Sequence, residues 1–99
     1  MYSLIVLEDA KQEWFAAIDY YETKQKGLGE RFLKAVEEYL KVLSETPKLY
    51  KKTKKQYREV PIKHFPFLII YRINELNNEV VVVSVFHAKR HPKHKYNKG

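Results

Sequence analysis

Residues 65–73 read FPFLIIYRI and residues 80–86 read VVVVSVF, and these two runs decide the fold. Both runs are rich in β-branched and aromatic residues, and both have the length of a strand. The polar pair Asn77-Asn78 between them is typical of a hairpin turn. We therefore predict strands at Phe67–Ile73 and Val80–Phe86. The near-continuous apolar character of the second run predicts a central strand that is buried on both faces.

A first helix is predicted upstream of these strands. Its apolar face recurs at helical spacing, at Trp14, Ile18 and Tyr21. Asp9 and Gln12 form a capping-box pattern, which predicts Asp9 as the N-cap residue. Gly27 is a natural left-handed residue after a helix and predicts where this one ends.

A second helix follows the short turn at Leu28-Gly29. Its apolar residues lie four, four and three apart, at Phe32, Val36, Leu40 and Leu43. Thr46 precedes Pro47 and therefore avoids the helical conformation, which predicts the end of the helix. Two long helices with so short a link must form an antiparallel hairpin, and their apolar faces need the sheet as a partner.

The remaining strands are predicted at Tyr2–Leu7 and Tyr57–Ile62, where Pro61 indicates an edge position or an early end. The resulting order is β-α-α-β-β-β, which belongs to the α+β class. The length of 99 residues predicts a single domain, residues 1–99, with a basic C-terminal tail at residues 93–99.

The charge is divided unevenly between the two halves of the chain. Residues 1–46 hold nine acids and six Lys/Arg, a net charge of −3, whereas residues 47–99 hold three acids and thirteen Lys/Arg, a net charge of +10. Such a division indicates that one side of the molecule meets an anionic partner. No cysteine is present, which excludes disulfide and thiolate chemistry and fits a cytoplasmic location.

Several motifs along the chain resemble the RelE/ParE family of bacterial toxins from type II toxin–antitoxin modules. They are the acidic start of the first helix at Glu8-Asp9, its aromatic face, residues 27–32 (GLGERF), Pro47, residues 65–72 (FPFLIIYR) and residues 85–92 (VFHAKRHP). The resemblance covers nearly the whole chain. It implies a four-stranded, mainly antiparallel sheet that packs against the helical hairpin.

The resemblance also implies a partner and a target. The partner is a cognate antitoxin that wraps the toxin with an extended and a helical segment, and aromatic residues of the first helix, such as Tyr20, belong to the core or to the antitoxin groove. ParE-like members inhibit DNA gyrase by binding it, whereas RelE-like members cleave messenger RNA on the ribosome. A third possibility is a family member that binds its antitoxin and nothing else.

Candidate site residues cluster in the basic half. RNA cleavage without a metal requires a base, an acid and cations for the phosphate, and the candidates for these roles are His87, Arg90, His91 and Tyr96. Candidate contacts to nucleic acid or to another target are Lys51, Lys52, Lys54, Lys55, Arg58, Arg72 and Lys89. Arg72 is expected either to point toward the basic edge or to pair with Glu75 or Glu79 across the hairpin.

Three positions depart from the RNA-cleaving branch of the family. The resemblance aligns Glu59 and Pro61 with the lysines of the second strand, and Leu68 with an arginine of the third. A carboxylate where a phosphate should bind opposes cleavage. Together with the long helical hairpin, these departures favour the ParE-like reading, which is inhibition of gyrase by binding.

Plainer interpretations of the same residues are that His87–His91 is a solvated basic strand end and that Lys51–Lys55 is a solvated loop. His87, His91 and His94 could ligate a metal, but neighbouring lysines repel cations and no carboxylate lies nearby in the sequence, so no metal or other cofactor is expected. No run approaches the length needed to span a membrane, and no membrane partner is expected.

Overall fold

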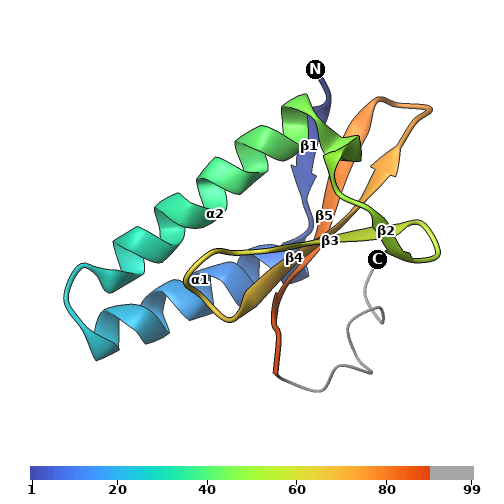
Figure 1. Ribbon diagram of the computed structural model, residues 1–99. Coiled ribbons are helices and arrows are strands. Elements are labelled where there is room, and N and C mark those ends of the chain that lie inside the picture. The colour runs from blue at the N-terminus through green and yellow to red at the C-terminus, as the bar shows by residue number, and fades with distance from the viewer. Residues whose placement is uncertain (90–99) are drawn as a thin grey trace.

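The computed structural model describes residues 1–89, and its strands and helices follow the predicted order closely (Figure 1). The elements are β1 (Ser3–Val6), α1 (Glu8–Lys24), α2 (Leu28–Glu45), the short 3₁₀ helix η1 (Pro47–Leu49), β2 (Lys52–Lys54), β3 (Tyr57–Pro61), β4 (Phe67–Asn74) and β5 (Glu79–His87). β3 ends at Pro61, which confirms the early end that this proline predicted. None of the helices within these residues has the length and apolar character needed to cross a membrane.

The described strands form one sheet in the order β1-β5-β4-β3-β2. β1 pairs with β5 in parallel, and every other neighbouring pair is antiparallel. The α+β class and the mainly antiparallel sheet are thereby confirmed. The number of strands is corrected from four to five, because the basic connector contains β2, which pairs with Tyr57 and Arg58. The sequence Lys-Thr-Lys has no apolar alternation that could have indicated this strand.

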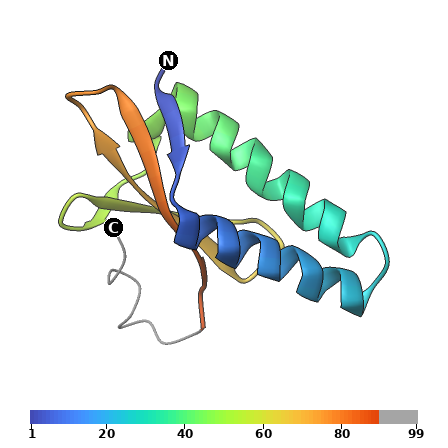
Figure 2. The same ribbon diagram turned by 180° about the vertical axis from the view of Figure 1, so that it is seen from behind.

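Both helices lie on one face of the sheet, and their apolar stripes form the core against it (Figures 1 and 2). The four predicted residues of α2 are all buried, namely Phe32, Val36, Leu40 and Leu43. β5 lies between β1 and β4 and is buried from Val80 to Phe86, which confirms the predicted central strand. Val80 and Val82 face the helical layer, while Val81 and Val83 belong to a second apolar cluster on the other face.

The start of α1 differs from the prediction. The helix begins at Glu8, its N-cap residue is Leu7, and no side chain caps it. Leu7 donates its backbone N–H to the carbonyl of Val82 (3.0 Å), so the chain passes from β1 into the helix at this apolar residue and Asp9 is not the N-cap. Asp9 and Glu8 instead occupy the first turn, where carboxylates interact favourably with the helix dipole.

The link between the helices depends on two glycines and one carboxylate. Gly27 has a left-handed backbone (φ 88°), as predicted, but it serves as the N-cap residue of α2 rather than as the residue that ends α1, since α1 ends at Lys24. The carboxylate of Glu22 accepts hydrogen bonds from the backbone N–H groups of Gly27 (2.9 Å) and Gly29 (3.0 Å). A Cβ atom on Gly29 would lie 2.6 Å from the carbonyl oxygen of Ile18, so this position permits the close approach of the two helices.

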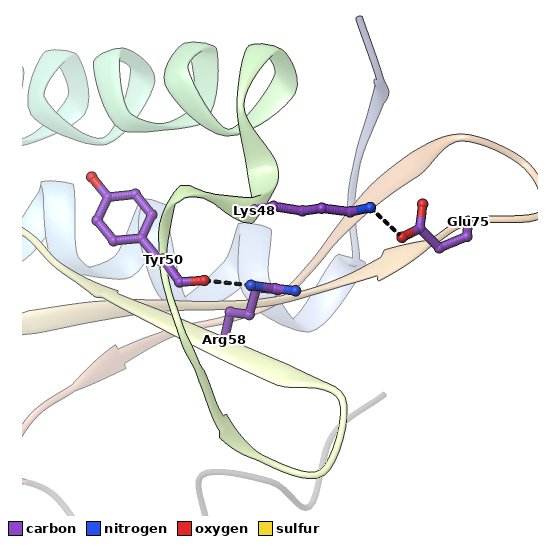
Figure 3. A network of polar contacts seen from close by, with 4 residues as sticks. All are labelled: Lys48, Tyr50, Arg58 and Glu75. Atoms are coloured by element: carbon purple, nitrogen blue, oxygen red, sulfur yellow. Dashed lines mark hydrogen bonds and ion pairs between the residues drawn. The ribbon is translucent and has the colours of Figure 1, made fainter.

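A set of polar contacts fastens η1 to the sheet. The buried hydroxyl of Tyr71 donates to the carbonyl of Pro47 (2.6 Å), and burial raises the pKa of Tyr71 to about 12. Figure 3 shows two further contacts, an ion pair between Lys48 and Glu75 (2.9 Å) and a hydrogen bond from the Arg58 guanidinium to the Tyr50 carbonyl. The hydrogen bond and the charge of Glu75 raise the pKa of Lys48. These contacts hold the chain that connects α2 with β2.

We predict that stability falls in alkaline solution because of Tyr71. An unfolded tyrosine loses its proton near pH 10, whereas folded Tyr71 keeps its proton to about pH 12, so the free energy of unfolding should fall as the pH rises from 10 to 12. Tyr71→Phe should cost about 1 kcal/mol at pH 7 through the lost hydrogen bond. Urea titrations of both proteins at several pH values test this, and a difference in stability that does not shrink above pH 10 would contradict it.

We also predict that Gly29→Ala destabilises the protein although alanine favours helices. The added methyl group must separate the two helices or displace Glu22, at a cost of about 1–3 kcal/mol in the free energy of unfolding. Gly27→Ala is the matched comparison, because its Cβ would meet nothing within 4 Å and its cost is limited to backbone strain of about 1 kcal/mol. A gain in stability for Gly29→Ala would show that the helices do not need this contact.

Candidate functional site

Four of the seven exposed lysines among residues 47–89 lie on the segment that contains β2. We call residues 51–55 the basic hairpin arm, and its four lysines, Lys51, Lys52, Lys54 and Lys55, are all exposed. Lys55 adopts a left-handed backbone (φ 52°) at the turn into β3. The Thr53 hydroxyl donates to the carboxylate of Glu59 (3.2 Å), which ties the arm to β3. The arm therefore presents a dense positive charge at the edge of the sheet.

Arg58 and Arg72 lie on opposite faces of the sheet. Arg58 is paired with Tyr71 in the register of β3 and β4, and its guanidinium donates to the Tyr50 carbonyl on the helical side. Tyr71 belongs to the helical core, so Arg72, the next residue along β4, projects to the other face. Arg58 thus has a structural contact, and the two arginines do not form one site.

His87 is the last residue of β5 and packs against the start of β4. Its ring packs edge-on against Phe67, with centroids 5.1 Å apart, and its Nδ1 accepts a hydrogen bond from the backbone N–H of Lys89 (3.2 Å). In the neutral ring the proton therefore resides on Nε2. His87 is half-buried, whereas Lys89 is exposed.

The structure does not bring the described site residues together. His87 lies opposite Phe67 at one end of β4, whereas the basic hairpin arm joins the sheet at the level of Tyr71 and two strands beyond β4. From strand spacing and rise, the arm and His87 are roughly 20 Å apart. Arg90, His91 and Tyr96, the other candidates for RNA cleavage, lie outside the described residues, as does His94.

An open cleft of about 530 Å³ lies between α1 and the end of β5, and we call it the edge cleft. Its α1 wall includes Glu13, Ala16 and Tyr20, and its sheet wall includes Val85, Phe86 and His87. Tyr20 is 56% exposed and contacts the ammonium of Lys24, whose Nζ lies 5.1 Å from the ring centroid. The cleft places aromatic, imidazole and carboxylate groups around an apolar floor.

Glu13 joins the two walls of the edge cleft, and sequence reasoning missed it. One of its carboxylate oxygens, Oε1, accepts hydrogen bonds from the hydroxyl of Ser84 (2.8 Å) and from the backbone N–H of Val85 (3.1 Å). Ser84 is fully buried and needs such a partner. A signal was present in the sequence, since one polar residue inside the run VVVVSVF requires a hydrogen-bond partner from another element.

The chain matches a family model described as the ParE toxin of the type II toxin–antitoxin system parDE, over residues 4–92. No curated protein matches the chain in sequence. The fold is similar to that of a protein from the chromosomal ParDE system of P. aeruginosa, with a TM-score of 0.67 and 18% identity over 90% of this chain and 98% of that chain.

Structures of RelE share the fold to the same degree. The isolated E. coli RelE toxin has a TM-score of 0.67 and 18% identity, over 95% of this chain and 92% of that chain. The intact E. coli RelBE toxin–antitoxin complex gives a TM-score of 0.68 and 19% identity, over 91% of this chain and 100% of that chain. These likenesses establish the fold and do not distinguish between the two branches.

We predict that Glu13 contributes to stability through its acceptor oxygen. Glu13→Ala leaves the N–H of Val85 and the hydroxyl of Ser84 without this partner, which should lower the free energy of unfolding by about 1–3 kcal/mol. Glu13→Gln keeps an acceptor oxygen and should lower the free energy of unfolding by less than about 1 kcal/mol. Urea denaturation followed by circular dichroism compares the two variants. Equal losses would show that the charge, rather than the acceptor, matters.

Proposed function

Because the chain belongs to the ParE toxin family of type II toxin–antitoxin systems, we propose that it arrests bacterial growth by binding DNA gyrase and that a cognate antitoxin neutralises it. The toxins of similar fold come from the ParDE system and from the RelBE complex, in which toxin and antitoxin are paired. Their pairing supports an antitoxin partner for this chain.

The observation that carries the choice of gyrase is the chemistry of β3 and β4. The resemblance aligns Glu59, Pro61 and Leu68 with cations of the RNA-cleaving members. In this chain Glu59 accepts a hydrogen bond from Thr53, Pro61 ends β3, and Leu68 packs against the apolar cluster on the face away from the helices. A scissile phosphate placed there would meet a carboxylate and no cation from these three positions, which opposes transition-state stabilisation.

The distribution of positive charge fits binding better than catalysis. The basic hairpin arm and His87 are roughly 20 Å apart, which is too far for groups that must act on one phosphate. A broad cationic surface instead accelerates association with an anionic partner, such as gyrase with its bound DNA. The lysines of the arm therefore act as docking contacts in this proposal.

One observation favours ribosome-dependent RNA cleavage as a second candidate function. The backbone N–H of Lys89 donates a hydrogen bond to Nδ1 of His87, which leaves Nε2 directed away from the backbone. In that position Nε2 could exchange a proton with a substrate. With Arg90, His91 and Tyr96 as its companions, His87 would then belong to a cleavage site.

We predict that the purified chain inhibits supercoiling by gyrase and that Lys54→Glu/Lys55→Glu weakens this inhibition at least about tenfold, through loss of the cationic docking surface. Lys11→Glu/Lys41→Glu is the matched control, because it reverses two exposed charges on the helices and should change inhibition less than about twofold. A supercoiling assay with titrated toxin measures both variants.

Three results, one from this assay and two from induction of the toxin in growing cells, would contradict the proposal in different ways. Unchanged supercoiling at high toxin excess would exclude gyrase as the target. Cut transcripts in translating cells after induction, lost in His87→Ala, would establish the RNA-cleaving alternative. Absence of growth arrest would leave a family member that binds its antitoxin and has no further target.

A further inference from the structure

The basic hairpin arm has the composition of a nucleic-acid contact rather than of a protein contact. Residues 51–56 read KKTKKQ, and all six are exposed and polar. Protein–protein interfaces depend on a few aromatic, apolar or arginine side chains, and lysine is depleted in them. Contacts to phosphates come instead from lysines and from hydroxyl and amide side chains. The arm therefore favours a nucleic acid as its partner.

The arm lacks the exposed rings that hold single strands. Proteins bind unpaired bases by stacking them on aromatic side chains. The rings that flank the arm, Tyr50 and Tyr57, pack instead against the two apolar clusters on opposite faces of the sheet. Tyr57 is only 7% exposed. A double-stranded partner fits better, because its bases are already stacked and its phosphates are accessible.

A β-bulge directs the lysines of β2 to both sides of the hairpin. Lys52 pairs with Arg58 of β3. After a shift of register, Lys54 pairs with Tyr57. Opposed residues of an antiparallel pair share a face of the sheet, whereas neighbours along a strand face opposite sides. Lys52 therefore lies on the helical side and Lys54 on the other side, although regular alternation would place both on one face.

A two-stranded ribbon with cations on both sides fits the major groove of duplex DNA. This groove is about 12 Å wide and admits a β-ribbon, and one phosphate backbone borders it on each side. Lys52 would meet one backbone and Lys54 the other. The major groove of an RNA duplex is too narrow for such an insertion. The geometry of the arm thus selects DNA.

The fold also turns the arm away from the acidic helices. α1 and α2 together hold nine acids and five Lys/Arg, a net charge of −4. In Figures 1 and 2 the turn between β2 and β3 points away from both helices. Glu59 at the base of the arm is half-buried and accepts a hydrogen bond from Thr53 (3.2 Å), and the arm together with Glu59 keeps a net charge of +3. DNA can approach the lysines without meeting the charge of the helices.

We propose that the basic hairpin arm inserts into the major groove of duplex DNA and contacts the phosphates of both strands without reading the base sequence. Lysines contact phosphates whatever the sequence, and the guanidinium of Arg58 is already held by the Tyr50 carbonyl. This inference rests on the proposed function for its setting, since the DNA is then the segment that gyrase holds. The contact itself does not require gyrase.

Fluorescence anisotropy with the full chain and a labelled DNA duplex, at a series of salt concentrations, tests this proposal. Each phosphate contact adds about 0.9 to the steepness with which log K falls against log salt. Lys52→Gln and Lys54→Gln should therefore each lower the steepness by about 0.9, and the double variant by about 1.8. The double variant should also bind at least about tenfold more weakly in low salt.

Lys11→Gln/Lys41→Gln is the matched control for the double variant. It removes the same charge from two exposed positions on the helices and should change the steepness by less than about 0.5. Two duplexes of different base sequence should bind with affinities within about twofold of each other. Circular dichroism of every variant checks that the fold is kept.

Several results would overturn the proposal. Absence of DNA binding, or an unchanged salt dependence in the double variant, would show that the arm is not the contact. An effect of only one of the two single variants would show that the arm lies on the DNA by one face and does not enter the groove. Tighter binding of single-stranded DNA or of an RNA duplex would show that the partner is a different nucleic acid.

The gyrase assay fails or succeeds independently of these results. If the toxin binds DNA as expected but leaves supercoiling unchanged, the target assignment fails and the DNA contact stands. If the double variant loses inhibition of gyrase but keeps its affinity for DNA, the arm contacts gyrase itself, so the DNA contact fails and the proposed function stands.

Discussion

The burial of β5 on both faces is the constraint on which the rest of the structure depends. Its valines need apolar neighbours in the helical layer and on the opposite face, while β4 pairs with its backbone along the strand and β1 pairs with Glu79–Val82. Ser84 is the one polar exception and requires a partner inside the protein. Glu13 supplies that partner, so a single hydroxyl helps to set where α1 crosses the sheet.

This arrangement gives the molecule an apolar centre and a charged periphery. The cations lie outside the apolar core, and the basic hairpin arm is far from the end of β5. Such a pattern suits recognition over a wide surface rather than chemistry at one point. The edge cleft, between α1 and the end of β5, lies on a different part of the molecule from the arm, which joins the sheet through β2.

Much of the fold could be predicted from periodicity, and the features that could not be predicted have physical causes. The stripe from Phe32 to Leu43 and the strands β4 and β5 depend on apolar spacing, which a single sequence displays. β2 depends on backbone pairing alone, and its side chains show no apolar alternation that would predict a strand. The first turn of α1 is shaped by the bond from Leu7 to Val82, a tertiary contact that overrides the capping pattern at Asp9. Of the candidate site residues, the sequence indicated the lysines and His87 but missed Glu13.

The sequence by itself determined the order of the elements, the apolar faces of the helices, the central place of β5 and the concentration of positive charge after residue 46, because each is a local pattern or a composition. Only the tertiary structure decided that β1 would pair with the first half of β5, from Glu79 to Val82. It also decided that Glu13 would meet Ser84, 71 residues away, and that Arg58 and Arg72 would face opposite ways. Register and the meeting of distant segments result from packing the whole chain at once, and no local spacing encodes them.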